Sequence, residues 1–319
     1  MMNSLQSVSY WKDYFNNPQG ASLGLLNAIY AVGSVVAMPI FPIIADKLGR
    51  RWGIIIGATF ILIAVALQTS AQNIRMFTAA RFLIGLGVQI GQGCAPLLLT
   101  ELCHPQHRAP FTAIYNTTWF VGNIIATWTT FGTAGNIQNT WCWRLPSLLQ
   151  GIFAAFQLLG IWFVPESPRW YIQKNRPEKA LKIISHYFAN DDENDITVQF
   201  VHKEIETTLA LEKEFAHYTI WEFFKTKANR HRLLILVTLG LFSQWSGNAI
   251  ISYYLTQVLN QVGITDQKTQ LEINGGLGIW GWIVAVVSSL YCDKVGRRKL
   301  FLLSTFCMMI VYVYLSRSF

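Results

Sequence analysis

Charged residues stand in the same six-residue pattern at two places in this chain, each time directly after a long apolar run. The copies read Asp46-Lys47-Leu48-Gly49-Arg50-Arg51 and Asp293-Lys294-Val295-Gly296-Arg297-Arg298. Aspartate and arginine side chains at one membrane depth can form ion pairs that open and close as helices move. The glycine before the arginines allows a tight turn. The repeat indicates two related halves built from spanning helices, with a binding site between them.

Further acid–base pairs mark the other turns on the same side: Glu101 with Arg108, and Glu166 with Arg169. We predict that these residues and the two signatures form salt-bridge clusters between bundles, which would stabilise one of two conformations. In the alternative interpretation the basic residues only anchor loops on the cytoplasmic side. The recurring acidic residues favour the clusters, because membrane topology does not require them.

Arg81 differs from these residues because it lies inside an apolar run. An ionisable group within a bilayer costs several kcal/mol unless it is paired or hydrated, which makes Arg81 a candidate functional residue. The alternative is a side chain that extends to the outer interface, since Arg81 lies only a few residues into the expected helix.

The composition is that of a membrane protein. Hydrophobic residues make up 52% of the chain and charged residues 13%, about half the roughly 25% that is usual in soluble domains. The net charge is +8. The basic residues lie in short turns between apolar runs, which indicates that they orient the chain in the membrane rather than bind nucleic acid. The cysteines have no metal-ligand spacing, so we expect no metal and no cofactor.

Eight apolar runs predict the transmembrane helices, since a span needs about 20 mostly apolar residues. They cover roughly residues 21–45, 52–71, 76–100, 111–133, 145–164, 233–258, 273–292 and 300–315. The turns at 46–51, 101–110 and 293–299 hold eight Lys and Arg residues, whereas the opposite set, 1–20, 72–75, 134–144 and 259–272, holds four. The basic set should therefore face the cytoplasm.

The long loop over residues 165–232 should also be cytoplasmic, with one helix starting at Pro177 and a second over about 196–215. It separates an N-terminal bundle (residues 1–164) from a partial C-terminal bundle (residues 233–319). The glycine pairs Gly53/Gly57 and Gly87/Gly91 are each spaced four apart, which predicts close helix packing.

The ordered set of motifs resembles the sugar porter family of the major facilitator superfamily, most of all its fungal lactose-permease and hexose-transporter branch. The resemblance spans nearly the whole chain. It rests on the two signatures and on Arg81-Phe82-Leu83-Ile84-Gly85-Leu86-Gly87, Trp143-Arg144-Leu145-Pro146, Pro165-Glu166-Ser167-Pro168-Arg169, Gln244-Trp245-Ser246-Gly247 and Tyr253-Tyr254. It implies an all-α polytopic fold of two bundles, of which this chain holds about eight of twelve helices and lacks the first and the last three. In this family Arg81 would pair with an acidic residue on helix one.

The resemblance also implies a sugar site at mid-membrane depth between the bundles. Amides both donate and accept hydrogen bonds, and aromatic rings pack on sugar faces. The candidates are Asn116, Gln244, Trp245, Asn248, Tyr253 and Tyr254. Amides within spans can instead hold helices together, and for Asn116 the two roles are balanced. The chain departs from the family at Ser243, Asn248 and Gly281, so the sugar is not identified.

We therefore expect a sugar transporter of the plasma membrane that works by alternating access as a proton symporter, with sugar, protons and lipid as its partners. Two alternatives remain open, a non-transporting sugar sensor on the same fold and an inactive truncated product. The sequence holds no Walker-type loop, dinucleotide fingerprint or nucleophile motif, so we predict no enzymatic activity.

Overall fold

The structure is a computed structural model that describes residues 2–215, 222–245 and 248–318. Within these ranges every regular element is a helix. Two short helices come first, α1 (Met2–Ser7) and α2 (Ser9–Tyr14). The first bundle follows, with α3 (Ala21–Ala37), α4 (Ile40–Lys47), α5 (Arg50–Thr69), α6 (Ile74–Leu102), α7 (Arg108–Asn136) and α8 (Trp141–Gly160).

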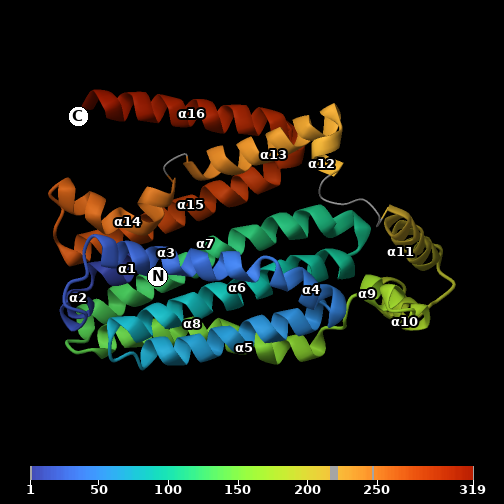
Figure 1. Ribbon diagram of the computed structural model, residues 1–319, viewed down its shortest axis with the longest axis horizontal. Helices are drawn as coiled ribbons and strands as arrows, with labels where there is room; N and C mark the ends of the chain where they lie inside the picture. Colours follow the sequence, from blue (N-terminus) through green and yellow to red (C-terminus); the bar gives the residue numbers. More distant parts are fainter. Residues whose placement is uncertain (1, 216–221, 246–247, 319) are drawn as a thin grey trace.

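The remaining helices follow a 3-10 turn over Ile161–Phe163. Figure 1 shows α9 to α11 at one end of the bundle, and α13 to α16 along its side. Their bounds are α9 (Pro168–Gln173), α10 (Pro177–Phe188), α11 (Ile196–Phe215), α12 (Glu222–Lys225), α13 (Lys227–Trp245), α14 (Asn248–Gln261), α15 (Gln267–Val295) and α16 (Arg297–Ser318).

Four helices of the described chain are long and apolar enough to cross a membrane alone: α5, α6, Trp141–Phe163 and Gln267–Tyr291. Helices α3 and α4 form a fifth candidate together, with a bend of 42° between them. The bend lies at Pro39, which has no N–H for the helical ladder and so favours a break there. The predicted run over residues 21–45 is therefore one bent segment.

The apolar run over residues 233–258 does not form the single helix that we predicted. Its described parts are α13, up to Trp245, and α14, from Asn248, and residues 246–247 lie outside the described part of the chain. Within α14 the helix is kinked at Tyr254, whose φ of −129° departs from helical geometry. A count of apolar residues carries no signal for a kink within a run, which explains the wrong prediction.

Residues 2–14 form two helices, mostly buried in α1 and partly exposed in α2, rather than the outer loop that we expected. Trp11 of α2 packs with Phe15, Phe77 and Trp143 in an aromatic cluster at the end of the bundle. Helix α1 contacts α7, α14 and α15. Its polar residues bond to them, since Ser7 Oγ lies 2.9 Å from Thr256 Oγ1 and Asn274 donates to Ser4 Oγ at 3.0 Å. Helix α1 therefore joins the first bundle to the later helices.

Glycine packing holds α5 against α6, as the spacing of the glycines predicts. A Cβ on Gly57 would lie 2.7 Å from the nitrogen of Gly91 and 2.8 Å from the oxygen of Gly87, and one on Gly53 would collide with Cys94 Sγ. The same arrangement, which the sequence analysis did not identify, joins α3 to α6. A Cβ on Gly33 would collide with the carbonyl of Phe82.

Helices α7 and α15 form the main contact between the first bundle and the later helices. Three glycines of α15, spaced three apart, face large side chains of α7. A Cβ on Gly281 would lie 2.6 Å from Phe120, and one on Gly275 would lie 3.1 Å from Trp128. Small residues thus let the two helices approach closely.

Helices α10 and α11 confirm the two helices predicted for the long loop. They pack on one another through Ile184, Val198 and Val201, which are all buried. Pro177 occupies the first turn of α10, where the missing N–H has no cost.

The glycine contact between α5 and α6 gives a direct test of the packing. We expect Gly57→Leu to lower the free energy of unfolding by about 1–3 kcal/mol, because the added side chain must push two backbones apart. Thermal unfolding of the purified protein in detergent measures this loss as a lower Tm. Gly24→Leu is the matched control, since a Cβ on Gly24 has nothing within 4 Å. Equal Tm values for the two variants would contradict the packing role.

Candidate functional site

A polar cavity of about 530 Å³ lies between the first bundle and helices α13 to α15. Helices from both sides supply its walls. The first bundle contributes Tyr30 from α3, Arg81 from α6, Trp119 and Asn123 from α7, and Gln150 from α8; the other side contributes Gln244 from α13, Tyr253 from α14 and Asn274 from α15.

The lining suits a small ligand with many hydroxyl groups. Its five amides, those of Asn3, Asn123, Gln150, Gln244 and Asn274, can each donate and accept hydrogen bonds. Trp119 and Tyr253 add aromatic faces on which an apolar ring face can pack. No aspartate or glutamate is among the described residues that line the cavity.

Arg81 is the charged residue of this lining, and it is buried, with 7% of its surface exposed. Its Nε donates to the carbonyl of Leu26 at 3.2 Å, and its guanidinium lies 5.6 Å from the centre of the Tyr30 ring. The side chain therefore points inward and does not extend to the bundle surface. Among the ion pairs of the described residues none involves Arg81.

The structure brings together two of the six residues that the sequence suggested for substrate binding, Gln244 and Tyr253. Asn116 lies outside the cavity, where its amide donates to the carbonyl of Thr112 in its own helix at 3.1 Å. Trp245 is 75% exposed at the end of α13, and Tyr254 is not among the lining residues. The side chain of Asn248 lies outside the described part of the structure.

Sequence reasoning missed four lining amides, those of Asn3, Asn123, Gln150 and Asn274. Asn123 follows Asn116 by seven residues, which is two helical turns and about 10 Å along the same face. The two residues therefore lie on one face of α7, and the cavity lies two turns further along it than Asn116. Gln150 is a polar residue within an apolar run, and this is a signal that could have singled it out. Asn274 stands at the polar start of its run and carries no such signal.

A charged network lies at the end of the bundle where α4 meets α5. Arg50, with 6% of its surface exposed, pairs with Glu101 of α6. Arg50 NH2 donates to Glu101 Oε1 at 3.3 Å, whereas Nε lies 3.1 Å from Oε2 without hydrogen-bond alignment. Arg50 also donates to the carbonyl of Ala45 at 3.1 Å and lies 3.8 Å from Asp46.

Glu166 holds the turn that begins α5. Its carboxylate accepts from the backbone nitrogens of Arg50 and Arg51 at 3.0 Å, and from that of Ser167 at 2.9 Å. Burial raises the pKa of the Glu166 carboxyl, and these backbone donors oppose the rise. Gly49 has a φ of +107°, and a Cβ there would collide with Glu166. Glycine is thus needed at this turn for two separate reasons.

The other predicted network residues lie around this centre. Arg51 packs over the Trp162 ring, Arg108 donates to the carbonyl of Cys103 at 3.3 Å, and Arg169 pairs with Glu212 of α11. Gly296 of the second signature has a φ of +90°, as the turn requires, and Arg298 is exposed. The side chains of Asp293 and Arg297 lie outside what the structure describes.

We predicted charged clusters between the two bundles, but the described ion pairs lie elsewhere. The Arg50, Glu101 and Glu166 contacts join α5, α6 and the segment after α8, all within the first bundle. Arg169–Glu212 joins two helices of the long loop. The sequence identified residues that pair, but their partners depend on which helices are neighbours in space.

The fold and this site define a polytopic membrane protein with a polar cavity between two sets of helices. The model of the family "Sugar (and other) transporter" matches residues 2–319, so the chain belongs to this family. It is therefore an integral membrane protein of the sugar porter type, as the motifs suggested.

The chain is similar to named members of the family. It is 26% identical over 302 residues to a high-affinity glucose transporter of Kluyveromyces lactis, covering 95% of this chain and 54% of the relative. It is 27% identical over 327 residues to a probable quinate permease of Aspergillus niger, covering 98% of this chain and 60% of the relative. The chain thus spans little more than half the length of these relatives.

Solved structures of the xylose transporter XylE from Escherichia coli have the same fold. One in a partially occluded inward-open conformation superposes with a TM-score of 0.74 at 19% identity, covering 94% of this chain and 69% of that chain. Another, a proton:xylose symporter bound to 6-bromo-6-deoxy-D-glucose, gives a TM-score of 0.77 at 20% identity, again over 94% and 69%. These confirm the predicted major facilitator fold.

The Arg50–Glu101 pair should contribute much more to stability than the exposed pairs. We expect Glu101→Gln to lower the free energy of unfolding by about 3–5 kcal/mol, because it leaves a buried guanidinium without its carboxylate. Thermal unfolding in detergent measures the change. Glu212→Gln is the control, since Glu212 is 56% exposed and its pair should contribute less than about 1 kcal/mol. Similar effects in both variants would rule out a special role for the buried pair.

Proposed function

We propose that this protein carries a sugar or a related polyhydroxylated solute across the plasma membrane by alternating access, coupled to protons, and that it is not an enzyme. The observation that carries the proposal is the amide-lined cavity. Asn123 and Gln150 reach it from the first bundle, and Gln244 and Asn274 from the opposite side. A site divided in this way can open to either side of the membrane as one set of helices rocks against the other.

The solute class is supported by the lining and by the names of the similar proteins. Amides and aromatic rings suit a polyol, and the relatives are described as glucose transporters and quinate permeases. Proton coupling is supported by the proton:xylose symporter among the structural neighbours and by the buried Arg81. The fixed positive charge of Arg81 suits pairing with a carboxylate that takes up and releases a proton.

The Arg50, Glu101 and Glu166 contacts support a rigid first bundle in this mechanism. They fix the ends of α5 and α6 and of the segment after α8 to one another. A bundle held in this way moves as one body, which is what alternating access requires of each half.

Uptake of radiolabelled sugar in a transporter-deficient yeast tests the function. A panel of glucose, xylose, galactose and lactose would be measured with and without a protonophore, using the complete protein. We expect uptake of at least one sugar and a strong reduction by the protonophore. Uptake that the protonophore leaves unchanged would contradict symport, and no uptake despite good surface expression would contradict transport.

Variants of the lining amides test the site. We expect Gln244→Ala and Asn123→Ala to raise KM for the transported sugar about 10-fold, because each leaves a sugar hydroxyl without its partner. Concentration-dependent uptake, corrected for surface expression, measures the change. Asn136→Ala is the control on α7, since Asn136 is exposed and its amide donates to Gly132 in its own helix. An unchanged KM in both lining variants would remove this cavity as the sugar site.

A further inference from the structure

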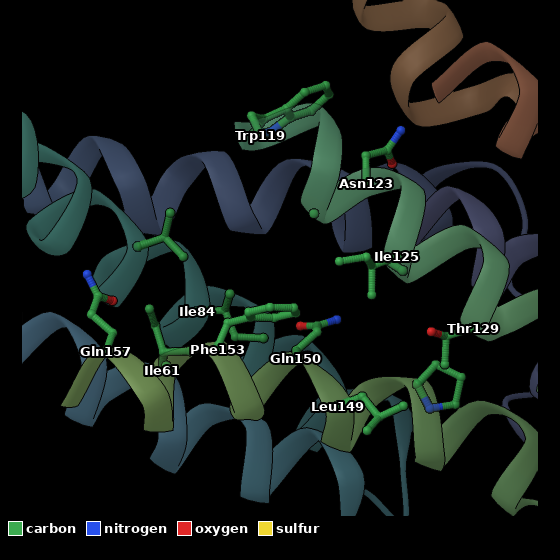
Figure 2. A pocket seen from close by; sticks show the side chains of 15 residues that line it. Ile61, Ile84, Trp119, Asn123, Ile125, Thr129, Leu149, Gln150, Phe153 and Gln157 are labelled. Carbon is green, nitrogen blue, oxygen red and sulfur yellow. The ribbon is translucent and has the colours of Figure 1, made fainter. Parts of the chain in front are cut away.

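A second cavity, of about 610 Å³, adjoins the polar cavity within the first bundle (Figure 2). It lies between α7 and α8, with side chains of α5 and α6 forming its other wall. Five residues line both cavities: Ile84, Val88, Trp119, Asn123 and Gln150. The two spaces therefore meet at these side chains, two of which carry amides of the proposed sugar site.

The second cavity has a different chemistry from the first. It is lined mainly by apolar groups, with Ile61 from α5, Ile125 from α7, and Leu149, Phe153 and Ala154 from α8. Figure 2 shows side chains of α7 and α8 facing one another across it. No charged residue is among its described lining. A cavity of this volume and character accommodates the apolar body of a small molecule.

We propose that this cavity receives an apolar substituent of the transported sugar, so that the protein takes glycosides or related polyols that carry an aromatic or aliphatic group. The proposal rests on the proposed function. The sugar would lie among the amides of the polar cavity. Its substituent would pass Asn123 and Gln150 and enter the apolar cavity, where burial of its surface strengthens binding.

The arrangement favours such an amphipathic solute over the acyl chain of a lipid. The apolar cavity ends at the polar one, at Asn123, and it also holds Thr129 and Gln157. The amides that distinguish the two ligands are those of Asn123 and Gln150, which line both cavities. An acyl chain can bond to neither amide, and covering them with hydrocarbon would cost free energy. A glycoside offers hydroxyls at this junction and hydrocarbon beyond it.

Matched inhibitors test the proposal. Phenyl β-D-glucoside and methyl β-D-glucoside share one sugar and differ in the substituent, and each would compete with uptake of radiolabelled glucose. We expect the phenyl compound to inhibit at least about 10-fold more strongly, as burial of a ring predicts. If the protein transports xylose and not glucose, phenyl and methyl β-D-xyloside would compete with radiolabelled xylose instead.

Glycines of α7 provide the decisive variants. Gly122 lines the apolar cavity and not the polar one, and a Cβ there has nothing within 4 Å. Gly122→Leu should fill the apolar cavity. We expect the phenyl compound then to inhibit less than about 3-fold more strongly than the methyl compound. Gly135→Leu is the control, because Gly135 is equally open and lines neither cavity, so the advantage of the phenyl compound should stay at its original value. Phe153 lines the apolar cavity and not the polar one, so Phe153→Ala should also reduce the advantage of the phenyl compound over the methyl compound. This variant replaces Gly122→Leu if the latter does not reach the cell surface.

Each remaining outcome overturns the proposal. Equal inhibition by the two glucosides would mean that no apolar group is bound. A phenyl advantage that persists in Gly122→Leu and Phe153→Ala would place the ring elsewhere. A co-purified phospholipid that phenyl glucoside does not displace from the purified protein would make the cavity a lipid site. Absence of uptake for every sugar of the panel would instead overturn the proposed function itself.

Discussion

Backbone-to-backbone packing of α6 against α3 and α5 is the contact on which the rest of the structure depends. It is possible because glycines stand at the crossing points on all three helices, among them Gly33, Gly57 and Gly87. In a bilayer, hydrocarbon outside a helix is as apolar as the side chains it would bury, so association relies on close van der Waals contact. Helix α6 then carries both functional regions, with Arg81 at the cavity and Glu101 in the charged network.

The cost of polar groups in an apolar medium explains how those regions are built. Arg50 is buried, and it bonds to Glu101 and to a backbone carbonyl. Glu166 is buried, and it accepts from three backbone nitrogens. These groups are enclosed by protein and paired with it, so they hold one geometry. The amides of the cavity instead lie beside space that a ligand can fill, and this distinguishes the binding polar groups of this chain from the structural ones.

The contact between α7 and α15 places the cavity between the two sets of helices. Glycines of α15 meet the large residues Phe120 and Trp128 of α7. The same stretch of α7 holds Trp119 and Asn123, which line both the polar and the apolar cavity. The geometry of this one helix therefore decides how a sugar and any group attached to it would lie (Figure 1, Figure 2).

The sequence by itself determined the class of fold, the main helices of the first bundle, the helices of the long loop and the family. Apolar length and the charged turns set these features, and both are local along the chain. It also indicated that Gly53, Gly57, Gly87 and Gly91 serve packing, since their spacing places them on one helical face.

Only the tertiary structure decided which residues meet. The kink at Tyr254 lies inside an apolar run, so composition could not reveal it. Asn123 rather than Asn116 lines the cavity, although both lie on one face of α7, because depth along a helix is set by the helices packed against it. For the same reason Glu166 bonds to the first residues of α5, Arg50 and Arg51, which lie 116 and 115 residues away in sequence. Contacts of that range depend on how the helices cross, and no local pattern in the sequence records this.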